Sequence, residues 1–320
     1  VTFSGASTFA NVDMNGEFTI TVIDANSYTV NATTNASSTT SGGGSAVRAT
    51  YQITIGPQDQ VAQVGWGADS WGSGNWGGVG TFVPDALRLW SAMNFGEDLV
   101  FAPRGGGVYY WDATGGLTTR GVSIETLPGA ADPPVVQNLV FVSDVYRFVF
   151  CLGANDYLSS VQDPMLIRWA DQESITDWTP IATNQAGSLR LSHGSQIVAA
   201  IQTRQEILVW TDTSLYSLQY LGAPLVWGAQ LLADNISIVG PNAASVASGI
   251  VYWMGVDKFY MYDGRVQTLQ CDLRKYVFQD INSTQYLAYF SGTIEGFNEV
   301  WWFYASQSST TIDRYVVYNY

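Results

Sequence analysis

Residues 250–264, IVYWMGVDKFYMYDG, contain the pattern that predicts the fold: an apolar strand, a short polar turn and an aromatic strand. β-Branched and aromatic residues of this kind favour strands over helices. The same pattern occurs in four further pairs of segments: 99–101 with 108–112, 146–152 with 166–169, 207–210 with 215–218, and 300–303 with 315–318.

The distances between successive pairs along the chain are similar and suggest a repeat. Their second strands begin at Tyr109, Leu166, Leu215, Phe259 and Tyr315, so the offsets are 44 to 57 residues. Repeats of about 40–50 residues built from strand hairpins are typical of propeller blades. We therefore expect an all-β, propeller-like body of antiparallel blades. Because the spacing is irregular, a plain multi-sheet β-sandwich remains the alternative.

The rest of the chain divides into two further segments. Residues 1–55 are rich in Thr, Ser and Ala and alternate polar with apolar residues over 17–23, 28–31 and 49–55. This period of two predicts half-buried strands, and so a small β-sandwich or barrel domain. Residues 56–86 form a Gly/Trp-rich connecting segment, and residues 87–320 form the propeller-like domain. One helix is expected within residues 272–286, where apolar residues fall four apart.

Composition excludes several classes of protein. The chain has 13 Lys and Arg against 27 Asp and Glu, a net charge of −14, which argues against a protein that grips nucleic acid through its phosphates. With 47% hydrophobic and 12% charged residues it can bury a sizeable core, so disorder over its whole length is excluded. No apolar run reaches the roughly 18–20 residues of a membrane helix. We expect a segment of a longer polypeptide without a signal peptide, because it begins at Val1 with no basic region.

Few residues suggest catalytic or metal chemistry. Cys151 and Cys271 follow strand-like residues and are expected to be buried free thiols. A single histidine, His193, and no CxxC motif argue against a structural zinc site. His193 is expected in a turn, because no GxSxG motif accompanies it. Residues 105–107 are glycines, but an aromatic strand follows them where a phosphate-binding loop needs a helix.

Three acidic residues lie close together in the sequence: Asp171, Glu173 and Asp177. Such carboxylates could bind calcium or act as the acid and base of a glycosidase. The segment lacks the glycine and the terminal glutamate of an EF-hand loop, so a solvated loop whose Asp side chains cap local turns is favoured. The sequence thus predicts no catalytic residue, no metal site and no organic cofactor.

The tryptophans Trp66, Trp71 and Trp76 recur every five residues in a glycine-rich segment. Three such rings left in water would form an apolar patch that needs an explanation. Tryptophan is enriched among the residues that dominate protein interfaces. We therefore interpret these three as contacts with a neighbouring subunit or partner; core packing, glycan binding and disorder are the alternatives.

Several segments resemble tail proteins of short-tailed bacteriophages, specifically the tail nozzle (tubular tail) family. The resemblance covers nearly the whole chain and rests on structural motifs in residues 1–5, 104–112, 167–180, 186–212, 251–260 and 296–304. It implies a β-propeller with inserted β domains and a homohexameric ring below the tail adaptor, through which DNA leaves the virion. It also implies a virion protein assembled in the host cytoplasm, with adaptor and tail fibre or needle proteins as partners.

The charge pattern agrees with such a conduit. A net charge of −14 would repel phosphate, so we expect duplex DNA to pass through without tight binding. Aromatic-rich, charge-poor surfaces suit ring contacts. The alternative is a glycan-binding or glycan-cleaving propeller module of a phage tail that recognises the host. An extracellular adhesion module is a third class.

Overall fold

The computed structural model describes residues 1–24, 27–44, 46–50, 87–117 and 119–320. The chain divides into two compact units, Val1–Ile55 and Gly56–Tyr320. With 43% strand and 8% helix the fold is all-β, as predicted. The Gly/Trp-rich segment 56–86, with Trp66, Trp71 and Trp76, lies outside the described residues. None of the helices in the described ranges has the length and apolarity needed to cross a membrane.

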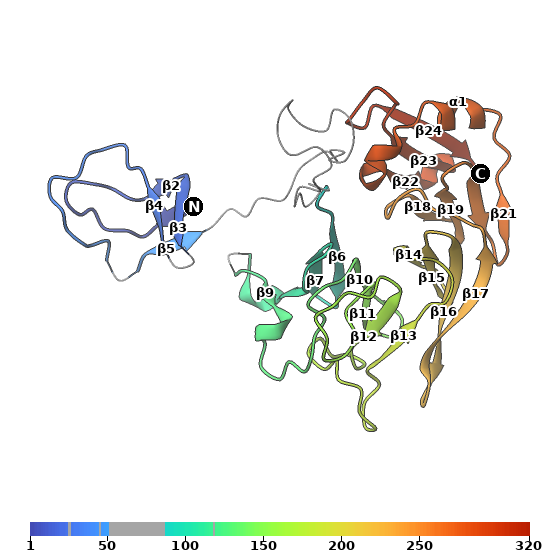
Figure 1. Ribbon diagram of the computed structural model, residues 1–320, viewed down its shortest axis with the longest axis horizontal. Coiled ribbons are helices and arrows are strands. Elements are labelled where there is room, and N and C mark those ends of the chain that lie inside the picture. Colours follow the sequence, from blue (N-terminus) through green and yellow to red (C-terminus); the bar gives the residue numbers. More distant parts are fainter. Residues whose placement is uncertain (25–26, 45, 51–86, 118) are drawn as a thin grey trace, which may run out of the picture. The chain divides into compact units, whose positions relative to one another are not determined.

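The first unit contains a small antiparallel sheet and a separate hairpin, drawn in blue in Figure 1. The sheet has the order β2-β1-β5, and the hairpin pairs β3 with β4. Their bounds are β1 Thr2–Ser4, β2 Gly16–Glu17, β3 Ile20–Asp24, β4 Ser27–Val30 and β5 Arg48–Thr50. Strands β2 to β5 therefore coincide with the three segments in which polar and apolar residues alternate.

The described part of the second unit contains five antiparallel sheets that follow one another around a common centre (Figure 1). We name them blades 1 to 5 in chain order. Blade 1 comprises β6 Trp90–Phe95, β7 Asp98–Pro103, β8 Tyr109–Trp111 and β9 Val122–Ser123. Blade 2 comprises β10 Leu139–Val142, β11 Val149–Leu152, β12 Leu166–Trp169 and β13 Gly187–Arg190. Blade 3 comprises β14 Ile197–Gln202, β15 Ile207–Thr211, β16 Ser214–Gly222 and β17 Val226–Asp234.

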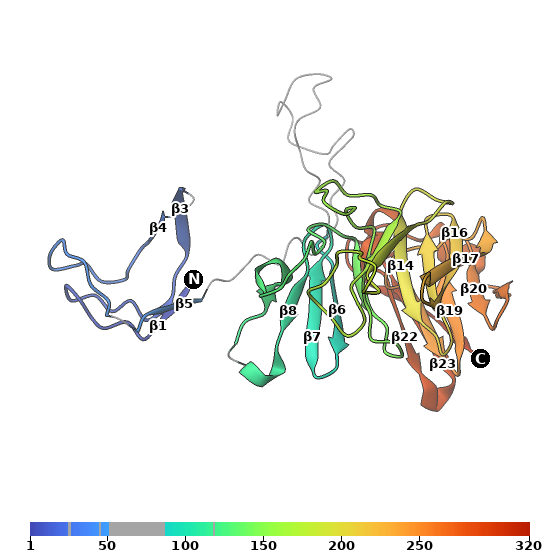
Figure 2. The same cartoon turned by 90° about the horizontal axis from the view of Figure 1, so that it is seen from below.

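The last two blades complete the propeller-like body. Blade 4 comprises β18 Ala244–Ala247, β19 Ile250–Met254, β20 Phe259–Tyr262 and β21 Val266–Thr268. Blade 5 has the order β22-β23-β24 in the described residues, with β22 Phe290–Ile294, β23 Glu299–Tyr304 and β24 Arg314–Asn319. The side view in Figure 2 shows the blade strands running alongside one another.

Each predicted strand pair forms the second and third strands of one blade. The segments pair as β7 with β8, β11 with β12, β15 with β16, β19 with β20, and β23 with β24. The first strands, β6, β10, β14, β18 and β22, lie nearest the centre (Figure 1) and contain no charged residue. Neighbouring first strands are linked directly: the Ser245 hydroxyl donates to that of Ser291 at 2.7 Å.

Aromatic side chains fill the layers between blades. The rings of Trp210 and Trp253, whose centroids are 5.4 Å apart, join blades 3 and 4, and those of Phe259 and Trp302, 5.0 Å apart, join blades 4 and 5. All three tryptophans are almost completely buried. Hydrophobic burial between sheet faces is thus the main force that holds neighbouring blades together.

The helix expected within residues 272–286 is present but shorter. It is α1, Arg274–Gln279, and it buries Val277. A separate 3₁₀-helix follows at η3, Ser283–Ala288, because the Asn282 side chain accepts a hydrogen bond from the Thr284 N–H and starts a new turn. The remaining 3₁₀ turns are η1 Ala113–Gly115, η2 Ile124–Thr126 and η4 Glu295–Phe297.

Candidate assembly surfaces and the predicted sites

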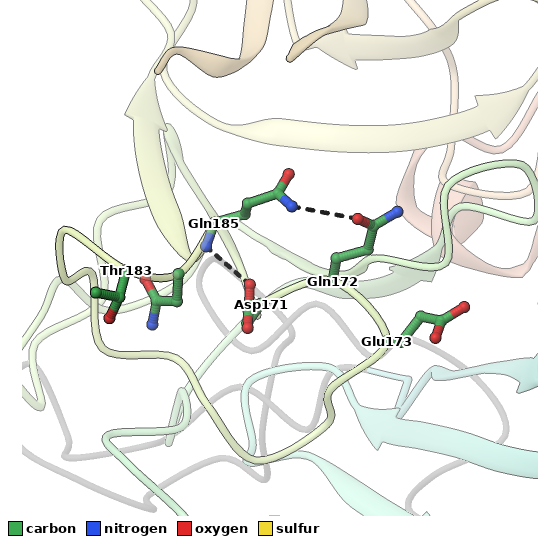
Figure 3. A pocket seen from close by; sticks show the side chains of 6 residues that line it. Asp171, Gln172, Glu173, Thr183 and Gln185 are labelled. Atoms are coloured by element: carbon green, nitrogen blue, oxygen red, sulfur yellow. Dashed lines mark hydrogen bonds between the residues drawn. The ribbon is translucent and has the colours of Figure 1, made fainter. Parts of the chain in front are cut away.

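The acidic segment after β12 forms a polar loop (Figure 3). Asp171 accepts a 2.8 Å hydrogen bond from the Gln185 N–H. Asp177 accepts one of 3.0 Å from the Asn184 side chain. Both carboxylates therefore stabilise the loop across its width, but neither caps a local turn as predicted. The Ser174 hydroxyl does so instead, because it accepts hydrogen bonds from the N–H groups of Thr176 and Asp177 at 3.3 and 3.1 Å. An open, polar pocket lies beside Asp171, lined by Asp171, Gln172, Glu173, Thr183, Asn184 and Gln185.

The third acidic residue, Glu173, points away from Asp171 in Figure 3. Its carboxylate lies 3.6 Å from Arg147 Nε, and both side chains are largely exposed. The three carboxylates thus have separate local partners. Within the described ranges, no three His, Cys, Asp or Glu side chains gather closely enough to hold a metal ion.

His193 lies in the turn between β13 and β14, as predicted. Its Nδ1 is 2.9 Å from the Ser192 hydroxyl and 3.1 Å from that of Tyr216. The nearby carboxylate of Asp212 instead accepts hydrogen bonds from the hydroxyl and N–H of Ser195, at 2.6 and 2.7 Å. The hydrogen bonds of His193 and those of Asp212 therefore go to different serines, and the three residue types do not form a hydrogen-bonded chain.

The two cysteines have different environments. Cys151 lies in β11 and is completely buried, and burial raises the pKa of its thiol well above the usual range. Cys271 is only partly buried, so the prediction of two buried thiols is wrong for this residue. It follows the end of β21, where the chain leaves blade 4 toward α1, and it lines a pocket that reaches Phe259 and Trp302 of the core between blades 4 and 5.

The three glycines after Arg104 form the connection between β7 and β8. Gly105 has φ +76°, a conformation that favours glycine. A strand follows, as expected, so the segment lacks the helix N-terminus that binds phosphate in glycine-rich loops.

The outer face of blade 5 carries a group of stacked aromatic rings. Alternation along β23 buries Trp302 against blade 4 and places Trp301 and Phe303 on the opposite face. Phe303 stacks on Phe290 with centroids 4.7 Å apart, and Trp301 stacks on Tyr315 at 4.8 Å. Phe290 remains 43% exposed and Tyr315 60%. Within the described part of the chain, this face has no covering sheet.

Blade 1 presents a similar face at the other end of the series. Val100 and Ala102 of β7 are fully buried toward blade 2, so Phe101 lies on the opposite face. Its ring stacks on Tyr109 at 5.5 Å and lies 6.2 Å from that of Trp90, which is 43% exposed. Both terminal blades thus expose aromatic rows of the kind that blades 2 to 4 bury.

Exposed arginines border the blade 1 face, whereas a carboxylate borders that of blade 5. Arg88 precedes Trp90, and Arg120 precedes Gly121, whose backbone packs against the Phe101 ring. On blade 5, Glu299 lies in the row next to Trp301 and accepts a hydrogen bond of 3.0 Å from its indole N–H. Large aromatic patches with a polar border are the usual composition of protein interfaces.

Sequence reasoning did not identify these two faces, because they depend on strand register. The row Phe290, Phe303 and Tyr315 forms only when β22, β23 and β24 pair as they do here. One signal was present. Residues 300–304, VWWFY, are apolar or aromatic at both alternating positions, as expected of a strand that is covered on both sides.

Comparison with known proteins leaves the family open. No protein-family model and no curated protein sequence matches the chain. Among solved structures it is similar to the extracellular domain of a protein described as a one component system of B. thetaiotaomicron, at 13% identity and a TM-score of 0.41 over 66% of this chain and 25% of that one.

Two further solved structures are similar at 8% identity. PorZ, a surface component of the type-IX secretion system of Porphyromonas gingivalis, has a TM-score of 0.41 over 68% of this chain and 31% of that one. Hsv2 of Kluyveromyces lactis has a TM-score of 0.36 over 70% and 61%. The chain therefore spans less than two thirds of each of these proteins. At these TM-scores the similarities carry no argument, and the propeller-like assignment rests on the sheet topology itself.

Proposed function

We propose that this chain is a structural subunit of the tail nozzle of a short-tailed bacteriophage. In this proposal six copies form a ring in the virion tail, assembled in the host cytoplasm, that retains the genome and then lets it pass. The observation that carries the proposal is the pair of stacked, half-exposed aromatic faces on blades 1 and 5. Faces of this kind suit a protein whose working state is an assembly. The sequence resemblance supplies the identity of the assembly.

The distribution of charge supports passage of DNA without tight binding. Within the described residues, six of the 13 basic residues form ion pairs with carboxylates: Arg147, Arg168, Arg190, Lys258, Arg274 and Arg314. Paired cations contribute little to phosphate binding, which depends on releasing counterions at clustered, free Lys and Arg. We expect weak, sequence-independent affinity for duplex DNA at physiological salt. Nanomolar binding with a steep salt dependence would instead favour a DNA-binding protein.

The native mass of the purified chain tests the proposal directly. Sedimentation velocity over a concentration series should give a species of six subunits. Phe303→Asp should shift the population toward monomer, because a charge would then be desolvated at the contact. Leu225→Asp is the matched control, since Leu225 is 68% exposed and lies between β16 and β17 of blade 3, far in sequence from both aromatic faces. A chain that stays monomeric at all concentrations would contradict the proposal.

The same aromatic faces support the second candidate, a glycan-binding module of a phage tail. Exposed rings such as Tyr315 and Trp90 can stack on sugar rings, and they need no partner subunit to do so. A monomer that binds bacterial surface polysaccharide and loses binding in Trp90→Ala would favour this candidate. A hexamer with no affinity for such glycans would favour the nozzle.

A further inference from the structure

A rigid apolar projection lies on the connection between β11 and β12. Leu158 and Val161 are 77% and 76% exposed, and Tyr157 is 42% exposed. We call these three residues the apolar knob. Single exposed apolar residues are common. Three of them within five positions of one short loop form an exposed apolar patch of the kind that marks protein interaction sites.

The loop is held in one conformation by a buried polar network. Leu158 has φ +57°, a left-handed conformation that a residue with a side chain keeps only where its surroundings enforce it. Its N–H donates to Asp132 Oδ2 at 3.1 Å, and the same oxygen accepts from the buried Arg168 at 2.8 Å. The side chain of Asn155, 1% exposed, donates to the Ser159 carbonyl at 2.7 Å. The knob is therefore preorganised and loses little conformational entropy on binding.

A pocket of matching size lies beside α1. It has a volume of about 170 Å³, and we call it the α1 pocket. Its lining is mostly apolar: Phe259, Leu269, Gln270, Cys271, Asp272, Leu273, Trp302, Val316, Val317 and Tyr318. A cavity of roughly 150 Å³ can hold a benzene molecule. The α1 pocket can therefore take a leucine side chain.

Charge and position make a second copy of the chain the fitting occupant. Asp156 precedes the knob and Lys275 lies on α1 beside the pocket; both are exposed, and neither forms an ion pair within the described residues. The two elements lie on different sides of the body in Figure 1, with β12 below and α1 at the upper right. Complementary patches that face apart join identical subunits head to tail.

We propose that Leu158 of one copy occupies the α1 pocket of the next copy and that this contact repeats around the ring. This inference rests on the proposed function, because a head-to-tail contact between identical chains closes a ring when its rotation allows. Asp156 then lies near Lys275 of the neighbour, which orients the two subunits.

A disulfide trap tests the contact. Leu158→Cys places a thiol in the knob, next to Cys271 of the neighbouring pocket. Mild oxidation with diamide, which takes up the two protons and two electrons of the thiols, should give a ladder of covalent multimers under denaturing, non-reducing conditions. The other native thiol, Cys151, is completely buried and does not compete.

Two controls make the result specific. Cys271→Ser in the Leu158→Cys background should abolish the ladder. Leu117→Cys, at a residue 94% exposed, should give none. A ladder of equal intensity in Leu117→Cys would overturn the inference, because it would show random collision.

The native mass separates this inference from the proposed function. If the Leu158→Cys chain sediments as a hexamer but does not cross-link, the knob contact is wrong and the ring proposal stands. If the unmodified chain is monomeric throughout, both fail. In unmodified rings, Cys271 should react with maleimide at least tenfold more slowly than in Leu158→Asp, which empties the pocket.

Discussion

Trp301 and Trp302 are adjacent in β23 but lie in contrasting regions of the molecule. Trp302 is 2% exposed in the layer between blades 4 and 5, where its indole N–H donates to the Ala243 carbonyl at 3.1 Å. Trp301 lies in the aromatic row on the outer face of blade 5. Tryptophan thus lies in the core on one face of β23 and at the surface on the other face. Strand alternation, rather than residue type, decides here which tryptophan is buried in the core and which lies at the surface.

The largest expected effect is the loss of stability on substitution of the buried residue, Trp302. Trp302→Ala should lower the free energy of unfolding by about 3–5 kcal/mol, because it removes a filled layer and leaves a cavity. Trp301→Ala should lower the free energy of unfolding much less, because the Trp301 ring is partly exposed to water. Urea denaturation of both variants at low protein concentration measures the difference. Equal losses would show that the outer face is part of the folded core, and Trp302→Phe offers a milder variant if the alanine variant does not fold.

The second prediction concerns assembly through the outer faces. Phe303→Ala or Tyr109→Ala should weaken self-association by roughly 10- to 100-fold, as truncation of a central interface aromatic often does. Unfolding of the monomer should change little. Sedimentation equilibrium gives the association constant. Unchanged association in both variants would remove these faces from the contact.

The third prediction concerns Trp71 of the glycine-tryptophan segment and asks whether it behaves like the surface residue Trp301 or like the buried residue Trp302. If Trp71 acts like Trp301, Trp71→Ala should weaken ring assembly several-fold while the isolated chain stays folded. Native mass spectrometry and circular dichroism report these two properties separately. A variant that unfolds as a monomer yet forms normal rings at native concentration would place Trp71 with Trp302 instead.

The smallest effect is a pH dependence at the edge of blade 5. The Ser306 N–H and hydroxyl each donate to Asp313 at 2.7 Å, and these bonds hold the pKa of its carboxyl below the usual range. A carboxyl with a lowered pKa stabilises the fold above its unfolded pKa of about 3.9 and loses that contribution as pH falls through the folded value.

Asp313→Asn should therefore be less stable than the unmodified chain at pH 7, and the difference should shrink as the pH falls below about 4. Thermal unfolding measured from pH 7 to pH 3 follows this convergence. Glu125→Gln, at an exposed residue, is the control. A difference that stays constant over the whole range would rule out the carboxylate as its source.

The sequence predicted the second and third strands of each blade because these strands are dense in aromatic and β-branched residues. It missed first strands such as β18, ASVA, because a short run of small residues has little intrinsic β preference. The aromatic faces were missed because they form across three strands, and register is a tertiary property. The apolar knob was missed for a different reason: Leu158 is exposed by its left-handed backbone, which its residue type disfavours.

The uncharged first strands of the blades bear on where a polyanion such as DNA could pass. β6, β10, β14, β18 and β22 surround the centre of the body without a single Asp, Glu, Lys or Arg. Desolvating a phosphate chain along such a lining is prohibitively costly, because nothing there replaces its water or counterions. In the proposed ring of six subunits, the propeller-like body of each subunit would therefore form one segment of the wall around the DNA. Under the proposed function, the lumen for the genome is the gap that six subunits would enclose, and its width would depend on the number of subunits rather than on the number of blades.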